Sequence, residues 1–168
     1  FHATAAGTAQ QWVNSVRLRS LKVAGDKLYF VTATTASGDE LWVLDQPTGT
    51  PRLVLDINPS GSSAPSFLTE MNGVLFFAAN DGEHGVELWR SDGTSAGTIL
   101  LERRDDGTSF SPSFVLGDKL LFLAPHPDYC NELWISDGTP GDGHVMGDAL
   151  LEPEYPFDGQ VANHVVSG

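Results

Sequence analysis

Polar and ionisable side chains that could do chemistry are concentrated in one short segment of the chain. Within five residues it carries four of them, namely Asn80, Asp81, Glu83 and His84. Such side chains could hold a hard cation through their oxygen atoms, or hydrogen-bond to the hydroxyl groups of a sugar. The spacing does not match the twelve-residue loop of an EF-hand, so an ordinary solvated turn is the alternative interpretation.

A weaker candidate site follows at His126 and Asp128. Calcium is the cofactor to test first, because these segments supply oxygen ligands and the chain has 22 acidic residues against 9 basic ones. Cys130 is the single cysteine, which excludes an intrachain disulfide and is interpreted as a small buried apolar residue. The sequence has no nucleophile elbow, His-Glu-x-x-His motif, phosphate-binding glycine loop or cysteine pair from which a catalytic site could be built.

Three glutamates recur in equivalent positions: Glu40, Glu87 and Glu132. They could form a ring of catalytic or calcium-binding carboxylates, but equivalent residues of successive units diverge unless they lie near a common axis. We therefore interpret each as a structural glutamate that accepts hydrogen bonds at the start of a strand. By the same reasoning, Asp92 and Asp137 are interpreted as turn residues.

These glutamates belong to a longer repeat. The stretch 87–98, Glu-Leu-Trp-Arg-Ser-Asp-Gly-Thr-Ser-Ala-Gly-Thr, recurs at 132–139 and, weakened, at 40–45. Each copy contains one tryptophan: Trp42, Trp89 and Trp134. The tryptophans are 47 and 45 residues apart, and a fixed period of this order is typical of repeat folds. Their rings could stack on sugars, but their place beside a leucine in mid-strand favours packing between repeats.

Each repeat is predicted to form four short strands. In the second repeat these strands cover 66–70, 74–78, 87–90 and 98–102. Asn72-Gly73 is the pair most favoured in a two-residue type I′ hairpin turn, and Asp92-Gly93 closes a tight hairpin. Other second strands, at 27–31 and 119–123, are also continuous apolar runs, so both faces must be covered. The fourth strand of the first repeat is expected over 52–57.

Four antiparallel strands per 45 to 47 residues, without helical periodicity, predict an all-β fold of β-propeller blades. The central strands of each blade would then pack between two neighbouring blades. The predicted core consists of Leu28, Phe30, Leu41, Trp42, Leu75, Phe77, Leu88, Trp89, Leu120, Phe122, Leu133 and Trp134.

The motif Glu-Leu-Trp-x-x-Asp-Gly-Thr, with Gly-Thr three residues on, resembles the ELWxxDGT repeat family of secreted and surface proteins of bacteria such as myxobacteria. The second repeat matches the motif fully and the third matches it as far as Thr139. The resemblance implies an extracellular or cell-surface location but no particular activity. Two departures leave the turn geometry of their repeats open: Asp45-Gln46-Pro47 in the first and Pro140-Gly141-Asp142-Gly143 in the third.

The formal net charge of −13 repels phosphate backbones and anionic membrane surfaces, so nucleic acid is not an expected partner. No apolar run is long enough for insertion into a membrane. Variable loops on a rigid scaffold favour a non-catalytic extracellular binding or adhesion propeller that recognises glycan or protein. Two alternatives are open: a hydrolase-type propeller with carboxylates at its central channel, and a purely structural segment of a larger surface assembly.

The repeats predict an incomplete propeller. We assign the end of a preceding blade to 1–13, three blades to 14–58, 59–104 and 105–152, and the start of a further blade to 153–168. A closed ring usually has about four to eight blades. Two copies joined through these partial blades would still lack second and third strands at each seam. We therefore expect other chains, or the remainder of the same polypeptide, to complete the ring.

Overall fold

A computed structural model of the chain describes residues 18–34, 36–103, 114–124 and 132–146. The first part forms strands β1 (Leu21–Ala24), β2 (Lys27–Thr34), β3 (Gly38–Leu44) and β4 (Arg52–Leu53). The second part forms β5 (Ser66–Met71), β6 (Val74–Asn80), β7 (Val86–Ser91) and β8 (Ile99–Glu102). The third part forms β9 (Phe114–Leu116), β10 (Lys119–Ala124), β11 (Glu132–Ser136) and β12 (His144–Val145). Within these ranges, no helix has the length and apolarity that a membrane span requires.

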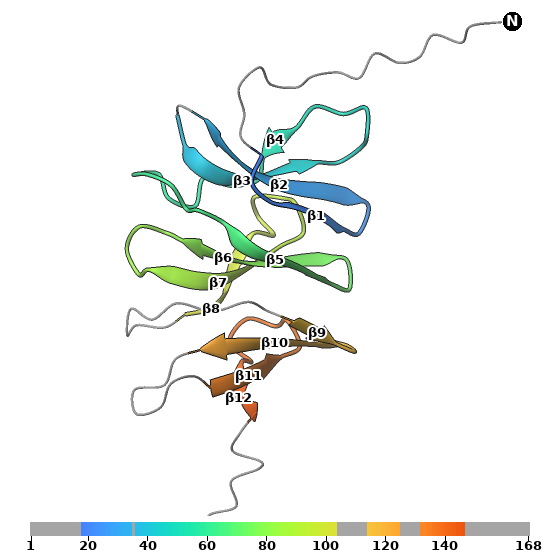
Figure 1. Ribbon diagram of the computed structural model, residues 1–168, viewed down its shortest axis with the longest axis vertical. Helices are drawn as coiled ribbons and strands as arrows, with labels where there is room; N and C mark the ends of the chain where they lie inside the picture. Colours follow the sequence, from blue (N-terminus) through green and yellow to red (C-terminus); the bar gives the residue numbers. More distant parts are fainter. Residues whose placement is uncertain (1–17, 35, 104–113, 125–131, 147–168) are drawn as a thin grey trace, which may run out of the picture.

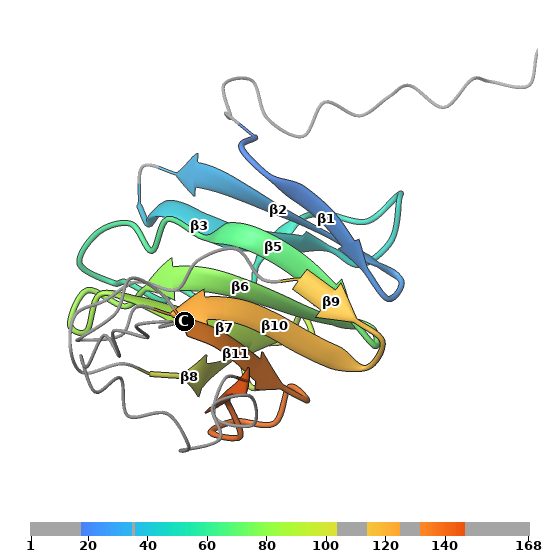
Figure 2. The ribbon, with the colours of Figure 1, turned by 60° about the horizontal axis from the view of Figure 1, so that its bottom comes forward.

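The strands form three four-stranded antiparallel sheets, each with its strands in sequence order. The first strands of successive sheets lie close together, β1 beside β5 and β5 beside β9. The sheets stack face to face from β1–β4 through β5–β8 to β9–β12 (Figures 1 and 2). This is the arrangement of successive propeller blades with their first strands innermost, and it confirms the predicted fold class.

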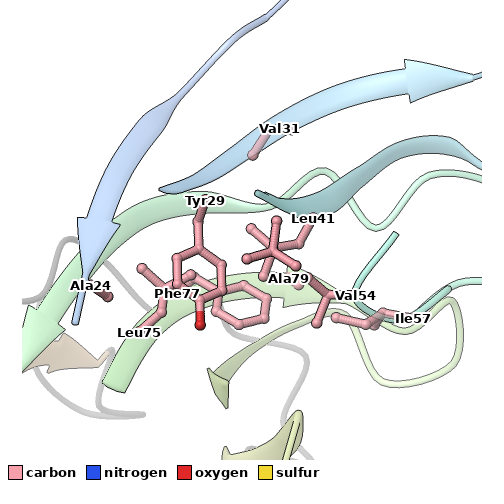
Figure 3. Packing of buried hydrophobic residues seen from close by; sticks show 10 residues of the cluster. Ala24, Tyr29, Val31, Leu41, Val54, Ile57, Leu75, Phe77 and Ala79 are labelled. Atoms are coloured by element: carbon pink, nitrogen blue, oxygen red, sulfur yellow. The ribbon is translucent and has the colours of Figure 1, made fainter. Parts of the chain in front are cut away.

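Side chains alternate between the two faces of each strand, so each sheet has two faces. We call the face towards the following sheet the back face and the opposite one the front face. On the back face of the first sheet, Tyr29 and Val31 pair with Val43 and Leu41. Figure 3 shows this face packing on Phe77 and its neighbours in the second sheet. The buried cluster contains Ala24, Tyr29, Val31, Leu41, Val43, Val54, Ile57, Leu75, Phe77 and Ala79.

The second and third sheets meet in the same way, back face to front face. Their buried cluster contains Met71, Phe76, Leu88, Leu101, Leu120, Phe122 and Ala124. Trp134 packs against this cluster, with its ring stacked 6.1 Å from that of Phe122. Trp89 packs in the equivalent position against the first cluster. Each contact between successive sheets, which we call a seam, therefore has a tryptophan from the front face of the later sheet.

An aromatic ring crosses each seam and lies against the Asp-Gly turn of the next sheet. A Cβ atom on Gly93 would lie 2.8 Å from Tyr29 Oη, and one on Gly138 would lie 2.8 Å from Phe76 Cζ. Both glycines have positive φ, 91° and 89°. Burial, and to a smaller extent the Asp92 carboxylate, raises the pKa of Tyr29 to about 12. Glycine is therefore required at these turns by backbone conformation and by the neighbouring blade.

The predicted turn residues have the predicted roles. Asp92 Oδ1 accepts a hydrogen bond from the Thr94 N–H at 2.8 Å, and Asp137 Oδ1 accepts one from the Thr139 N–H at 2.8 Å. Between β5 and β6, Asn72 and Gly73 have φ angles of 54° and 80°. Positive φ at both central residues is the signature of the type I′ turn that this dipeptide predicts.

The two departures from the repeat motif have different outcomes. In the third sheet, the Ser136 hydroxyl donates to Asp142, whereas in the second sheet Ser91 Oγ lies 2.8 Å from Thr98 Oγ1. The third turn thus keeps its form with a different partner. In the first sheet, Arg52 binds Asp45 through two hydrogen bonds of 2.9 and 3.1 Å, which replaces the Asp-Gly turn with an ion-paired one.

Two expectations from the sequence are wrong. The fourth strand predicted over 52–57 is regular only as far as Leu53. The Val54 N–H still donates to the Leu41 carbonyl at 3.0 Å, but the chain then turns towards Glu40, whose carboxylate accepts from the Ile57 N–H at 3.4 Å. Leu133, predicted in the core, is 38% exposed because no described sheet covers the back face of the third sheet. The partial blades predicted at 1–13 and 153–168 lie outside the described residues.

Candidate functional site

Three connections meet at one end of the sheets, which we call the loop end. They are the β2–β3 turn, the linker 54–65 and the β6–β7 loop 81–85, all on the left in Figure 1. The linker joins the other two through backbone hydrogen bonds. The Ala64 N–H donates to the Asp39 carbonyl at 3.1 Å, and the Asn80 N–H donates to the Ser63 carbonyl at 2.9 Å. The loop end is therefore one continuous surface across the first seam.

Glu40 holds the inner side of the linker. Its side chain is fully buried, and one carboxylate oxygen accepts from the Ser63 N–H at 2.7 Å. The other oxygen accepts from the Ser63 hydroxyl and from the Ile57 N–H. Burial raises the pKa of Glu40 above its usual value, although these hydrogen bonds act in the opposite direction. The prediction of a structural glutamate at a strand start is confirmed for Glu40.

Two glycines allow the linker to lie close against its neighbours. A Cβ atom on Gly38 would lie 2.7 Å from the Gly61 carbonyl oxygen. A Cβ atom on Gly82, where φ is 89°, would lie 2.6 Å from Asn58 Oδ1. Asn58 in turn donates to the Ser62 carbonyl and accepts from the Ser60 N–H, both at 3.2 Å. The β6–β7 loop thus rests on a linker that is ordered by its own hydrogen bonds.

Side-chain oxygens order the backbone of the β6–β7 loop. Asn80 Oδ1 accepts from the Gly82 N–H at 2.7 Å. Asp81 Oδ1 accepts from the N–H groups of Glu83 and His84 at 2.9 and 2.8 Å. These are Asx-type bonds, in which a short polar side chain replaces the hydrogen bonds of a regular strand. The loop has a defined conformation without being part of the sheet.

Asp81 and His84 also form a side-chain pair. His84 Nδ1 lies 2.6 Å from Asp81 Oδ2, and the two side chains are 30% and 22% exposed. Burial acts to raise the pKa of Asp81, but the hydrogen bonds from His84 and Glu83 outweigh it and hold this pKa at about 2. With its Nδ1 bound to a carboxylate, the imidazole has Nε2 left to contact a ligand. Both Asp81 oxygens are already engaged, which makes them poor ligands for a hard cation.

The structure therefore brings together the first four predicted site residues: Asn80, Asp81, Glu83 and His84. His126 and Asp128 lie outside the described residues. In the part of the chain that the structure describes, no three histidine, cysteine or acidic side chains gather where they could hold a metal ion. Trp89 and Trp134 are half-buried at the two seams, and Trp42 is half-buried on the front face of the first sheet.

Sequence reasoning missed the contribution of the linker. No role was predicted for residues 58–63, yet Asn58 and Ser63 contact the β6–β7 strand pair and its loop, while Ser60 and Ser62 hold the Asn58 side chain. A usable signal was the Asn-Pro-Ser-Gly-Ser-Ser sequence, because Asn and Ser side chains form turn-ordering bonds of this kind.

No family model matches the chain, and no curated protein matches it significantly. Among solved structures, the chain is similar to a puromycin hydrolase, with 16% sequence identity and a TM-score of 0.55. That alignment covers 77% of this chain and 20% of the hydrolase chain, so the chain spans about a fifth of its relative. It is also similar to the Bacteroides ovatus protein "Xyloglucan PUL GH43B", with 14% identity, a TM-score of 0.42, and coverage of 78% of this chain and 28% of that one. The likeness to the puromycin hydrolase supports the all-β propeller fold alone.

Proposed function

We propose that this chain is a non-catalytic, extracellular binding or adhesion propeller of the ELWxxDGT type, which recognises glycan or protein through its loop end. The observation that supports this most is the hydrogen-bonded order of the β6–β7 loop. Asp81 fixes the backbone of Glu83 and His84, so their groups are presented to a ligand with little further loss of conformational entropy.

The chemistry of the loop end suits hydroxyl-rich or polar ligands. Glu83 is exposed and supplies acceptors, while the His84 imidazole supplies one ring nitrogen and an apolar ring face. The exposed residue Ser60 lies on the adjoining linker and adds a hydroxyl group, whereas the Ser62 hydroxyl is held by the backbone of Asp39. Clusters of hydrogen-bond acceptors and donors on a rigid surface of this kind can bind sugars. They can also bind the polar rim of a partner protein's interface.

The alternative is a hydrolase-type propeller, and one observation favours it. An Asp–His pair with a 2.6 Å contact is the arrangement in which a carboxylate orients an imidazole to act as a general base. The puromycin hydrolase shares the fold at 16% identity, which carries no residue roles to this chain. In this alternative, His84 would take a proton from a nucleophile or from water.

A glycan array combined with a hydrolase screen tests the proposal. The loop variant would carry Asp81→Asn, Glu83→Gln and His84→Ala. Its control would carry Asp26→Asn and Asp118→Asn. These substitutions remove an equal number of negative charges, two, from exposed turns outside the loop end. We expect binding to be lost in the loop variant and kept in the control.

Other outcomes would reject the proposal. Turnover of a glycoside or amide at sub-stoichiometric protein, abolished by His84→Ala alone, would establish the hydrolase alternative. Binding that survives in the loop variant would move recognition away from this surface. A reproducible failure to bind any glycan or protein would favour a purely structural segment of a larger assembly.

A further inference from the structure

The middle sheet, β5–β8, has another sheet on each of its faces, and yet one of its aromatic side chains is exposed (Figure 1). This side chain is Phe67 on β5, which is 46% exposed. Apart from Ile99 on β8, the other exposed large apolar side chains in the described part of the chain lie on the first and third sheets or directly beside them. The exposure of Phe67 therefore does not come from a sheet face that lacks a neighbour.

Phe67 is an extra residue in its strand. Ser66 on β5 pairs with Ala78 on β6. Three residues later Thr69 pairs with Phe76, which is only two residues away from Ala78, so the strand contains a β-bulge. The corresponding strands β1 and β2 of the first sheet pair without such a shift. A bulge adds one residue to a strand and gives a side chain a new direction, so the insertion is a specific feature of the middle sheet.

The bulge holds Phe67 in a strained backbone conformation. Its φ angle is 55°, in the left-handed region where glycine is the usual residue. The Thr69 hydroxyl donates to the Phe67 carbonyl at 3.0 Å, and Leu68 packs against the first core cluster, so the chain is anchored directly after the bulge. A single exposed apolar side chain is ordinary. A large ring that is exposed and also costs backbone strain points instead to a function.

The bulge is connected to the loop end. The Ser63 carbonyl accepts from the Asn80 N–H at 2.9 Å, and Phe67 follows four residues later. Ser66 pairs with Ala78, two residues before Asn80 on β6. At about 3.4 Å per residue, Phe67 lies roughly 7–10 Å along the strands from the start of the β6–β7 loop. A short oligosaccharide is long enough to contact both.

The charges around the bulge limit the kind of ligand. The sequence has no lysine or arginine between Arg52 and Arg90. Arg19 is already paired with Asp39, with 3.3 Å between the charged groups. Glu83 is exposed on the β6–β7 loop. Acidic sugars would therefore be repelled without a compensating cation, whereas uncharged sugars would not.

We propose that Phe67 is a stacking platform for an uncharged glycan whose hydroxyl groups bind the β6–β7 loop. One face of a pyranose ring presents C–H groups, which pack on the electron-rich face of an aromatic ring. The hydroxyl groups at its rim need acceptors and donors of the kind that Glu83 and His84 supply. The anchored bulge holds the ring in place, so that stacking costs little conformational entropy. This inference rests on the proposed function, because it names the ligand class and a second contact of the same binding surface.

Binding of uncharged oligosaccharides tests the platform. The probes are oligosaccharides of glucose, galactose, mannose and N-acetylglucosamine, first on an array and then in isothermal titration calorimetry. Phe67→Ala should raise the dissociation constant about tenfold or more, because apolar contact area is lost, whereas Phe67→Trp should keep the affinity. The matched control is Ile99→Ala, because Ile99 is the other exposed large apolar side chain of this sheet and lies on its outer strand. The control should bind like the wild type.

Thermal stability gives a second readout that does not depend on the ligand. Phe67→Gly removes the ring and also relieves the positive φ, so the melting temperature should rise while binding is lost. A ring that served the fold would instead lower the melting temperature when it is removed. A melting temperature of Phe67→Gly below that of the wild type would overturn the proposal.

Failure of this inference and failure of the proposed function give different results. If the loop variant loses binding but Phe67→Ala binds like the wild type, the loop end is the binding surface and the platform is wrong. Wild-type binding to acidic glycans alone, or to proteins alone, would likewise keep the proposed function and overturn the platform. A wild type that binds no glycan and no protein would overturn both.

Discussion

The two ends of the blades use the same few residue types for different purposes. At the Asp-Gly turns, Gly93 and Gly138 lie directly beneath rings of the preceding sheet, and the turn is part of the seam. At the loop end, Gly85 has the same positive φ as Gly93, 92° against 91°, but nothing lies within 4 Å of its added Cβ position. The glycines of the recurring motif are therefore needed for packing between blades, whereas at Gly85 the β6–β7 loop has space for a side chain.

This contrast separates structural repetition from function. The motif recurs because every seam needs a tryptophan, an aromatic ring and a glycine in the same places. The β6–β7 loop is held by its own side chains and by the linker, so its sequence can vary without disturbing the seams. The loop end itself has two layers: Glu40 is buried under the linker, and the Asp81–His84 pair is partly exposed above it.

The largest expected effect is on a seam. Trp89→Ala removes the ring that packs on the first core cluster, and we expect it to lower the free energy of unfolding by about 3–5 kcal/mol. Chemical denaturation monitored by circular dichroism measures this change. An unchanged free energy of unfolding would mean that the ring contributes little to the seam and is free to contact a ligand.

The matched glycines provide a direct comparison of the two ends. In Gly93→Ala the alanine must adopt an unfavourable positive φ, and its Cβ atom also clashes with Tyr29. We therefore expect a loss of about 3 kcal/mol in the free energy of unfolding. Gly85→Ala meets only the backbone penalty, about 1–2 kcal/mol. Equal losses in the two variants would contradict the idea that the turn is clamped by the neighbouring blade.

Much of this fold follows from the sequence, for identifiable reasons. The period, the apolar second strands and the Asn-Gly and Asp-Gly pairs report local requirements, so the sheets and turns could be predicted. The short length of β4 could not, because Glu40 holds the following linker at Ile57 and Ser63, through contacts that span 17 and 23 residues. The exposure of Leu133 depends on which face has a neighbour, and the support of Gly82 by Asn58 depends on two separate connections meeting. Those facts exist only in three dimensions.

Glu40→Gln tests the inner layer of the loop end. The amide would present hydrogens where the carboxylate accepts from Ser63 and Ile57, and we expect a loss of about 2 kcal/mol at neutral pH. Because burial raises the pKa of Glu40, its contribution to stability is greatest at low pH and falls as pH rises through its folded pKa. The difference in unfolding free energy between wild type and variant should therefore shrink with rising pH. A constant difference from pH 3 to pH 8 would contradict this assignment.

The smallest effect belongs to the outer layer, and its pH dependence has the opposite sign. Asp81→Asn keeps an oxygen for the backbone N–H groups of Glu83 and His84 but loses the charged contact with the His84 ring. The partly exposed position limits the expected loss at pH 7 to about 1 kcal/mol or less. Since the pKa of Asp81 is lowered from 3.8 to about 2, its contribution is present above pH 3.8 and disappears as pH falls through about 2. Wild type and variant should thus differ slightly in unfolding free energy at pH 7 and converge only below about pH 2. If the Asp81→Asn loss instead matched that of Trp89→Ala, the loop would be part of the seam, and the distinction between the two ends of the blades would fail.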